Sequence, residues 1–197
     1  MNKILMFSGG IDSTYLAWKL MSSGIFLNLH HVSIRNDSEK MWKPQYNAIF
    51  GIIKYFIENG MNFKYTQSEF HFFGWRLIGF DSDILLLAAQ KVAQNFDGKV
   101  EVLLGWNPAD MLRPTIADRA KRSVTANIWS ALVQSAPILD MIADLKYPLI
   151  EWDKTKEEMI QEMPKDLLDM TWSCRRPVDG NPCGHCHACK AKNNRLF

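Results

Sequence analysis

Near its start the chain reads Lys3-Ile4-Leu5-Met6-Phe7-Ser8-Gly9-Gly10-Ile11-Asp12-Ser13-Thr14, an apolar run that leads into a glycine-rich turn. The apolar run predicts a buried strand, and the apolar spacing from Thr14 to Met21 predicts a helix that Gly24 ends. A strand, a glycine turn and a helix start form an anion-binding site, because backbone N–H groups face the ligand and the helix dipole attracts negative charge. We therefore expect a phosphate-binding loop here.

Polar side chains add to this loop. Ser8, Ser13 and Thr14 supply hydroxyl groups, and Asp12 can cap the helix or help to hold a magnesium ion. The loop lacks the Gly-Lys-Ser/Thr of a Walker A motif and the spacing of a dinucleotide-binding Gly-x-Gly-x-x-Gly motif. A turn that merely joins a strand to a helix is the plainer alternative, but the flanking strand and helix favour an anion site.

The loop resembles the pyrophosphate loop (PP-loop) of the N-type ATP pyrophosphatases, whose signature is Ser-Gly-Gly-x-Asp-Ser. All five defining positions are present, as Ser8, Gly9, Gly10, Asp12 and Ser13. The resemblance implies an enzyme that holds the pyrophosphate of ATP, with magnesium, while an acid, amide or carbonyl oxygen is adenylated. It implies a catalytic part for Asp12 and Ser13, and ATP contacts for Ser8, Gly9, Gly10, Ile11, Asp12, Ser13 and Thr14.

Further strands and helices alternate along the chain. Apolar runs predict strands at 25–34, 63–73, 100–105 and 147–152, and helical spacing predicts helices at 42–59, 83–95, 117–132 and 154–163. Short connections from strand to helix to strand favour parallel pairing. The expected fold class is α/β: a twisted, mostly parallel sheet with helices on both faces, as in the three-layer, adenine-nucleotide alpha hydrolase-like (PP-loop) fold.

Ligands of open α/β sheets gather at the carboxyl ends of the strands. Gly105 and Asn107 follow the strand expected at 100–105, so we expect both to face the same crevice as the glycine loop, with Gly105 on the nucleotide side. Arg113 and Arg119 could grip a carboxylate or phosphate there, with a solvated charged face as the equal alternative. His30 and His31 are expected to form a strand-end pair, with one ring inside and one outside.

The composition is typical of a soluble globular protein, with 47% hydrophobic and 22% charged residues. A net charge of +2 is too small to indicate nucleic acid as the main partner. No apolar run approaches the roughly 20 residues of a membrane span, and no signal peptide is recognisable. We therefore expect a cytoplasmic protein.

All four cysteines crowd together as Cys174-x8-Cys183-x2-Cys186-x2-Cys189. This spacing predicts a structural zinc ion in a closed, tetrahedral shell of four thiolates. Gly184 allows a tight turn that aims backbone N–H groups at the sulfurs, and His185 and His187 are substitute ligands. A redox role for one Cys-x-x-Cys pair and an iron–sulfur cluster are the minor alternatives.

The last part of the chain is similar to the carboxyl end of the 7-cyano-7-deazaguanine synthase family. The similar region contains Thr171-Trp172-Ser173-Cys174, then Asn181-Pro182-Cys183-Gly184-His185-Cys186-His187-Ala188-Cys189, and runs to Phe197. That family also begins with a PP-loop, and its Pro-Leu…Lys stretch is similar to Pro148-Leu149 and Lys154, which implies a catalytic part for Lys154. The resemblance implies that ATP adenylates the carboxylate of 7-carboxy-7-deazaguanine and that ammonia displaces AMP. A second ATP then drives dehydration of the amide to the nitrile.

The resemblance implies a PP-loop domain at 1–165 and a zinc-binding segment at 166–197, packed together as one structural unit. The middle departs from the family: Gly79-Phe80-Asp81-Ser82-Asp83 replaces a Pro-x-Arg-Asn run, and Met111-Leu112-Arg113-Pro114-Thr115 replaces a Tyr-Pro-Asp-Cys-Arg segment. In the family, the segments at these two places help to build the substrate pocket. Asn107, Arg113 and Arg119 are then the candidates for binding the deazaguanine acid, with Arg able to hold a carboxylate through two hydrogen bonds.

Other functions stay open. The enzyme could stop at the amide, or act on another acceptor in tRNA sulfur transfer, although that chemistry normally needs a cysteine outside the zinc site. A binding module that kept the fold without catalysis is a further alternative. We expect small molecules as partners, and a second copy in a homodimer, but neither a membrane nor nucleic acid. The chain is short for the family, which suggests a compact variant such as a viral one, then in the host cytoplasm.

Overall fold

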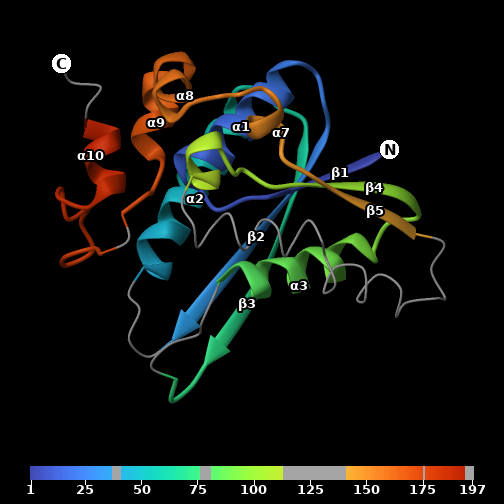
Figure 1. Ribbon diagram of the computed structural model, residues 1–197, viewed down its shortest axis with the longest axis horizontal. Coiled ribbons are helices and arrows are strands. Elements are labelled where there is room, and N and C mark those ends of the chain that lie inside the picture. Colours follow the sequence, from blue (N-terminus) through green and yellow to red (C-terminus); the bar gives the residue numbers. More distant parts are fainter. Residues whose placement is uncertain (37–40, 76–80, 113–140, 175, 194–197) are drawn as a thin grey trace.

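Five parallel strands form one sheet in the computed structural model (Figure 1), which describes residues 1–36, 41–75, 81–112, 141–174 and 176–193. The order across the sheet is β3-β2-β1-β4-β5, so the first strand of the chain lies in the middle. The strands are β1 (Asn2–Met6), β2 (Leu27–Asn36), β3 (Phe63–Phe72), β4 (Gly98–Leu103) and β5 (Met141–Lys146). Every pairing is parallel, which confirms the expected α/β sheet.

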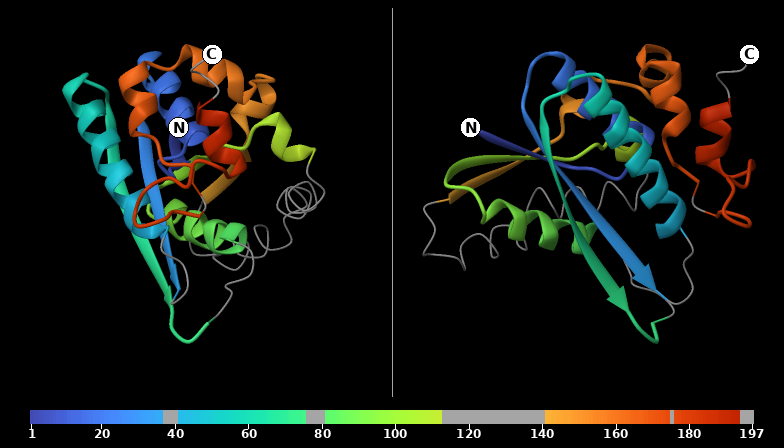
Figure 2. Two further views of the ribbon diagram at one scale, coloured as in Figure 1. Left: turned by 90° about the vertical axis from the view of Figure 1, so that its left-hand side faces the viewer. Right: turned by 180° about the vertical axis from the view of Figure 1, so that it is seen from behind.

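Helices cover both faces of the sheet, and alternate residues of β1 supply the two cores. Leu5 faces the core built with α1 (Ile11–Ser22), α2 (Trp42–Glu58), α8 (Lys156–Glu162) and α9 (Lys165–Met170). Ile4 and Met6 face the core built with α3 (Asp81–Ala93). The views in Figure 2 show these helices on opposite sides of the sheet, so the three-layer prediction is confirmed.

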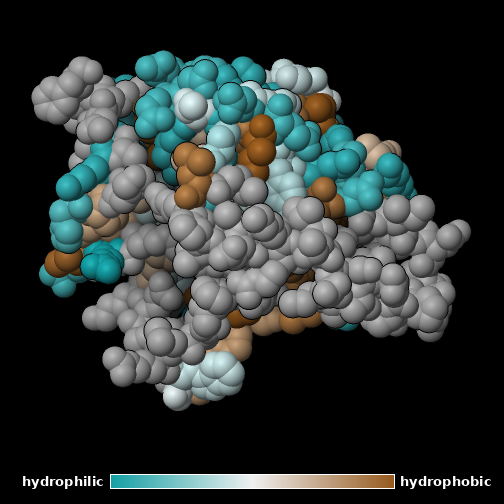
Figure 3. All heavy atoms as spheres, in the orientation of Figure 1, coloured by the Kyte–Doolittle hydropathy of each residue, from teal (hydrophilic) through white to brown (hydrophobic). Residues whose placement is uncertain are grey.

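The remaining helices in the described part of the chain are short. They are α4 (Pro108–Met111), α7 (Pro148–Glu151) and α10 (His187–Asn193). None of the described helices combines the length and the apolar character that a membrane span requires. In the view of Figure 3, hydrophilic residues cover most of the described surface in the upper part, around α8 and α9.

The strand predicted at 147–152 is wrong. Residues Pro148–Glu151 form helix α7, with Tyr147 as its N-cap, and the last strand is β5, which precedes it. Pro148 occupies the first helical turn, where its missing N–H costs nothing and its fixed φ suits a helix. The helix predicted at 117–132 lies outside the described residues.

The prediction that one ring of the pair His30 and His31 lies inside and the other outside is wrong, because both rings are buried. Each points to a different face of the sheet, and both faces are covered. The His30 ring bonds to the hydroxyls of Thr66 (2.8 Å) and Ser68 (3.1 Å), while His31 Nδ1 lies 3.0 Å from the Phe7 carbonyl oxygen. Burial, followed by the charge of His31, lowers the pKa of His30 to about 4, so its ring is neutral at pH 7.

Candidate functional site

The turn between β1 and α1 depends on a glycine at position 9. Gly9 has φ of +70°, and a Cβ atom there would lie 2.7 Å from Cγ1 of Ile49. The positive φ is strained for residues with a side chain, and the contact is too short for carbon atoms. Any larger residue would therefore push the loop away from α2.

The two serines of the loop bond to each other rather than standing free. Ser13 Oγ accepts from the Ser8 backbone N–H at 3.2 Å and lies 3.0 Å from Ser8 Oγ. The Gly10 N–H points towards Ser8 Oγ at 3.4 Å. Ser13 is buried and Ser8 is exposed, so Ser13 shapes the loop while Ser8 is the serine that a ligand can reach.

The start of α1 is left open to an anion. Gly10 is the N-cap residue, with an extended backbone, and no side chain caps the helix. The first backbone N–H groups of a helix have no partner within the helix. The N–H groups of Ile11, Asp12 and Ser13 are therefore the groups that suit a phosphate.

The side chains of Ile11 and Thr14 do not face this opening. Both are fully or almost fully buried. The Thr14 Oγ1 atom is buried and makes no hydrogen bond with the described part of the chain. In this structure, Ile11 and Thr14 can therefore make the predicted contacts with ATP only through their backbone groups.

Asp12 is held on both of its carboxylate oxygens. Asn107 Nδ2 donates to Oδ1 at 3.0 Å, and the Lys156 ammonium lies 3.0 Å from Oδ2. Asp12 does not cap α1, which decides between the two roles that the sequence left open for it. Its charge is instead fixed beside the loop by one amide and one cation.

The side chain of Asn107 positions Asp12 and does not face the solvent. Its side chain is buried and caps α4 by accepting from the Ala109 N–H at 2.9 Å. The Asn107 backbone N–H donates to Asp110 Oδ2 at 3.2 Å, which completes a capping box. Acceptor binding by Asn107 stays a prediction, and the contacts of its amide are internal. Arg113 and Arg119, the other two acceptor candidates, lie outside the described residues.

Gly105 brings the end of β4 against α1. A Cβ atom at Gly105 would lie 3.1 Å from both Cα and N of Ser13. The glycine thus lets the crossover to α4 pass directly over the first turn of α1. The structure places Gly105 at the predicted crevice, and its contact with the nucleotide stays a prediction.

Lys154 belongs to an ion-pair cluster that joins α1 to α8. Glu162 accepts from Lys154 Nζ at 2.8 Å, from the Tyr15 hydroxyl at 2.5 Å and from Lys19 Nζ at 3.0 Å. These contacts, that of Lys154 first, hold the pKa of Glu162 at about 2. The catalytic part predicted for Lys154 is not tested. Lys156, which the sequence analysis did not select, is the lysine at Asp12.

Replacing Glu162 with glutamine is expected to lower the free energy of unfolding by about 1–2 kcal/mol at pH 7, because half-exposed, charge-assisted hydrogen bonds are lost. The folded pKa lies below the usual 4.5, so this stabilisation is complete above about pH 4.5 and disappears as the pH falls towards 2. Urea unfolding of both proteins at pH 7 and pH 3 measures it. Glu58→Gln, an exposed carboxylate on α2, is the control. Equal stability of wild type and Glu162→Gln at pH 7 contradicts the prediction.

The four cysteines converge as the sequence predicts. The sulfurs of Cys174, Cys183, Cys186 and Cys189 all lie within 4.8 Å of one another. Cys183 and Cys189 Sγ are 4.0 Å apart, close to the roughly 3.8 Å that tetrahedral ligands at 2.3 Å require. Backbone N–H groups of Cys183 and Cys186 point at the sulfurs of Cys174 (3.3 Å) and Cys183 (3.4 Å). This donor set fits a zinc ion.

The ring of His185 bonds to the backbone and is not part of the group of four sulfurs. Its Nδ1 lies 2.8 Å from the Cys183 carbonyl oxygen, a contact that a protonated Nδ1 can make. Four thiolates already complete a tetrahedral shell, which leaves no position for water or a substrate. The geometry therefore suits a structural ion and assigns no ligand role to His185.

The segment that carries Cys174 also contacts the PP-loop. The Trp172 backbone N–H donates to the Gly9 carbonyl oxygen at 2.9 Å, and Gln45 Nε2 donates to the Ser8 carbonyl oxygen at 2.8 Å. A Cβ atom at Gly10 would lie 3.6 Å from the Trp172 carbonyl oxygen. The loop is thus fixed between α2 and the cysteine segment, which the sequence did not indicate.

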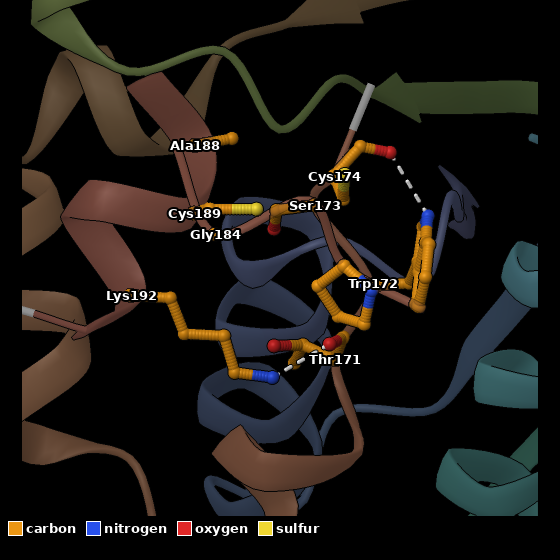
Figure 4. A pocket seen from close by; sticks show the side chains of 9 residues that line it. Thr171, Trp172, Ser173, Cys174, Gly184, Ala188, Cys189 and Lys192 are labelled. Atoms are coloured by element: carbon orange, nitrogen blue, oxygen red, sulfur yellow. Dashed lines mark hydrogen bonds between the residues drawn. The ribbon is translucent and has the colours of Figure 1, made fainter. Parts of the chain in front are cut away.

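A cavity of about 150 Å³ lies between this segment and α10 (Figure 4). Lys192 reaches across it and donates to the Thr171 carbonyl oxygen at 2.7 Å. The Trp172 indole N–H bonds to the Cys174 carbonyl oxygen at 3.0 Å. The lining residues are Thr171, Trp172, Ser173, Cys174, Pro182, Gly184, Ala188, Cys189 and Lys192. Because two of them are candidate metal ligands, the cavity belongs to the metal centre.

An open helix N-terminus behind a Ser-Gly-Gly-x-Asp-Ser loop, set in the middle of a parallel sheet, defines an α/β protein of the PP-loop class. The chain belongs to the family of the queuosine biosynthesis protein QueC, which matches residues 80–196. The matched part runs from α3 through the four cysteines and does not include the PP-loop. No curated protein sequence matches the chain.

Among solved structures, the U34-tRNA thiolase NcsA from Methanococcus maripaludis, with its [4Fe-4S] cluster, is similar with a TM-score of 0.46 and 16% identity. The alignment covers 98% of this chain and 66% of the thiolase chain, so the protein spans slightly less than two thirds of that length.

Proposed function

We propose that the protein is an ATP-dependent ligase that converts 7-carboxy-7-deazaguanine and ammonia into 7-cyano-7-deazaguanine. The observation that carries the proposal is the complete PP-loop at an uncapped helix N-terminus, in a chain of a queuosine biosynthesis family. The cysteine group at the other end supports it, since its spacing and ending are similar to those of the synthases. ATP, magnesium and a structural zinc ion are the expected cofactors.

The residues of the loop supply binding and charge neutralisation. Backbone N–H groups at the start of α1 hold the pyrophosphate end of ATP, and the Ser8 hydroxyl adds a donor. Asp12 is the carboxylate that would hold magnesium, and magnesium there offsets charge on the triphosphate. Positioning of this kind accounts for most of the catalysis in an adenylation, which needs no strong base.

The proposed reaction balances over two adenylations. A carboxylate oxygen of the acid attacks the α-phosphorus of ATP, and pyrophosphate leaves. Ammonia adds to the acyl carbon, loses a proton and expels AMP, which gives the amide. The amide oxygen then attacks a second ATP, pyrophosphate leaves, and loss of AMP with two N–H protons produces the nitrile. The net consumption is two ATP for each nitrile.

Incubation with magnesium, ATP, ammonium and the acid tests the proposal. AMP release that depends on the acid, together with a product of nitrile mass at two AMP per product, is the expected result. One AMP per product, with amide mass, indicates an enzyme that stops at the amide. ATP binding without acid-dependent AMP release contradicts the proposal and favours another acceptor or a binding module.

Arg113→Ala or Arg119→Ala is expected to raise the KM for the acid by about 10- to 100-fold, because loss of a charge-assisted contact costs about 1.5–3 kcal/mol. The KM for ATP should change far less, since neither arginine belongs to the PP-loop that is proposed to bind ATP. Steady-state kinetics with each substrate varied in turn measures the difference. Lys91→Ala, an exposed lysine on α3, is the control. An unchanged KM for the acid in both variants places acid binding elsewhere.

A further inference from the structure

We propose that Gln45 is a positioning residue of the PP-loop, which holds the peptide between Ser8 and Gly9 in the orientation that presents the Gly9 N–H to the pyrophosphate of ATP. The inference deepens the proposed function and rests on it, because it requires an anion at the loop. It starts from the hydrogen bond that Gln45 Nε2 donates to the Ser8 carbonyl oxygen at 2.8 Å.

Three successive carbonyl groups of the turn, those of residues 7–9, are held from outside it. Their partners, in chain order, are His31 Nδ1 at 3.0 Å, Gln45 Nε2 at 2.8 Å and the Trp172 backbone N–H at 2.9 Å. The peptides are trans, and a trans peptide points its N–H opposite to its C=O. The N–H groups of these peptides therefore face away from the elements that hold the carbonyls.

The Gly9 N–H differs from the N–H groups on either side of it. The Ser8 N–H donates to Ser13 Oγ at 3.2 Å, and the Gly10 N–H points towards Ser8 Oγ at 3.4 Å. The Gly9 N–H makes no hydrogen bond with the described part of the chain, although Gly9 is buried. Buried N–H groups without a partner are rare in folded proteins, so a ligand is the expected acceptor. The open start of α1, two residues later, is the place for that ligand.

The backbone at Gly9 does not select this orientation by itself. Gly9 has φ of +70°, and turning the peptide by about 180° would bring φ to about −110°, within the broad allowed β region. Glycine adopts both signs of φ about equally readily. The turned peptide would place the Ser8 carbonyl oxygen where the Gly9 N–H now lies, and that oxygen repels phosphate. Among the described side chains, that of Gln45 is the one bonded to this peptide, so it favours the orientation that accepts an anion.

Two substitutions remove the donor in different ways. Gln45→Met keeps the length of the side chain and loses the amide. Gln45→Glu keeps the shape, but a carboxylate only accepts hydrogen bonds, so it repels the Ser8 carbonyl and binds the N–H of the turned peptide. Isothermal titration calorimetry with inorganic pyrophosphate and magnesium measures the consequence. Gln45→Met should bind pyrophosphate about 10- to 100-fold more weakly than wild type, and Gln45→Glu at least as weakly as Gln45→Met. Gln161→Leu, which removes an exposed glutamine of α8, should bind like wild type.

A spectroscopic measurement reports the peptide itself. Cell-free synthesis with ¹³C-carbonyl serine and ¹⁵N-glycine marks two peptides of the chain, Ser8–Gly9 and Ser23–Gly24. In wild type, pyrophosphate should move the Gly9 amide proton downfield, because a hydrogen bond to an anionic oxygen forms. The Gly24 signal should stay in place, since its N–H already donates to the Met21 carbonyl oxygen at 2.9 Å. In Gln45→Met, saturating pyrophosphate should leave Gly9 without this shift. A merely structural glutamine would not change the Gly9 signal of the bound state.

Circular dichroism confirms that each variant is folded, and the remaining outcomes overturn the inference in distinguishable ways. If wild type binds pyrophosphate and Gln45→Met binds it equally well, or with the same Gly9 shift, the positioning part of Gln45 is wrong and the proposed function stands. The same holds if pyrophosphate binds to wild type without moving the Gly9 signal. If wild type does not bind pyrophosphate, the proposed function fails and the inference fails with it.

Discussion

Asp12→Asn is expected to reduce ATP-dependent AMP release by about 100- to 1,000-fold, the usual cost of removing a preorganised electrostatic contact from a transition state. The amide keeps the shape of the carboxylate and can still meet Asn107, but it removes the charge that would hold magnesium. Rapid-quench measurement of AMP from labelled ATP gives the rate. Ser13→Ala should also lose activity, because Ser13 Oγ holds the turn at Ser8.

The loss should occur without unfolding, since Asp12 is on the surface of the loop rather than in either core. Circular dichroism and the midpoint of thermal unfolding check this. Glu58→Gln changes the charge equally at a remote position and should keep full activity. An Asp12→Asn enzyme with the wild-type rate rules out the PP-loop assignment of Asp12.

Removal of the metal is the second change with a large expected effect. Cys174→Ser should eliminate zinc binding and unfold the cysteine segment, because apparent binding energies of structural zinc sites reach about 10–16 kcal/mol and are coupled to folding. The effect should extend to ATP, since Trp172, two residues before Cys174, donates to Gly9 of the PP-loop. Metal analysis, limited proteolysis and nucleotide titration measure the three consequences.

His185→Gln is the matched control, because its ring contacts a backbone carbonyl and should leave the metal content unchanged. Magnesium should differ from zinc: mild chelation is expected to stop turnover at once and reversibly, while a closed thiolate shell exchanges slowly. If the purified protein contains iron and absorbs visible light, the four cysteines hold an iron–sulfur cluster and not zinc. One zinc retained in Cys174→Ser contradicts the four-cysteine site.

The elements around the loop could be predicted from sequence because their signals are local. Lys3 to Phe7 is an apolar run, and Gly24 ends α1 with φ of +80°. Strand β5 carries no such signal: Met-Ile-Ala-Asp-Leu-Lys mixes apolar and charged residues, and pairing with β4 at the edge of the sheet decides its conformation. Pro148 did indicate a helix start at α7, because proline is common in the first turn of a helix. The apolar residues after it also fit a strand, and the prediction followed them.

The cysteine site could be predicted for the same reason, since its four ligands are close in sequence. Lys156 could not, because a lysine in the charged first turn of a helix is typical of a solvated surface. Its partner Asp12 is separated from it by most of the chain, and contacts of that range depend on the fold. Asn107 was placed at the correct edge, but its amide turned out to serve Asp12 and α4.

The position of β1 in the middle of the sheet affects how the chain folds during its synthesis. Of the five strands, β1 leaves the ribosome before the others, and it needs neighbours on both sides, β2 and β4. Its core with α1 is completed by Met159, Leu167 and Leu168, which are made long after β1. At about 5–20 residues per second, β1 waits on the order of ten to thirty seconds for these partners. The nascent chain therefore exposes β1 during this interval, and chaperone binding to residues 3–7 is expected throughout it.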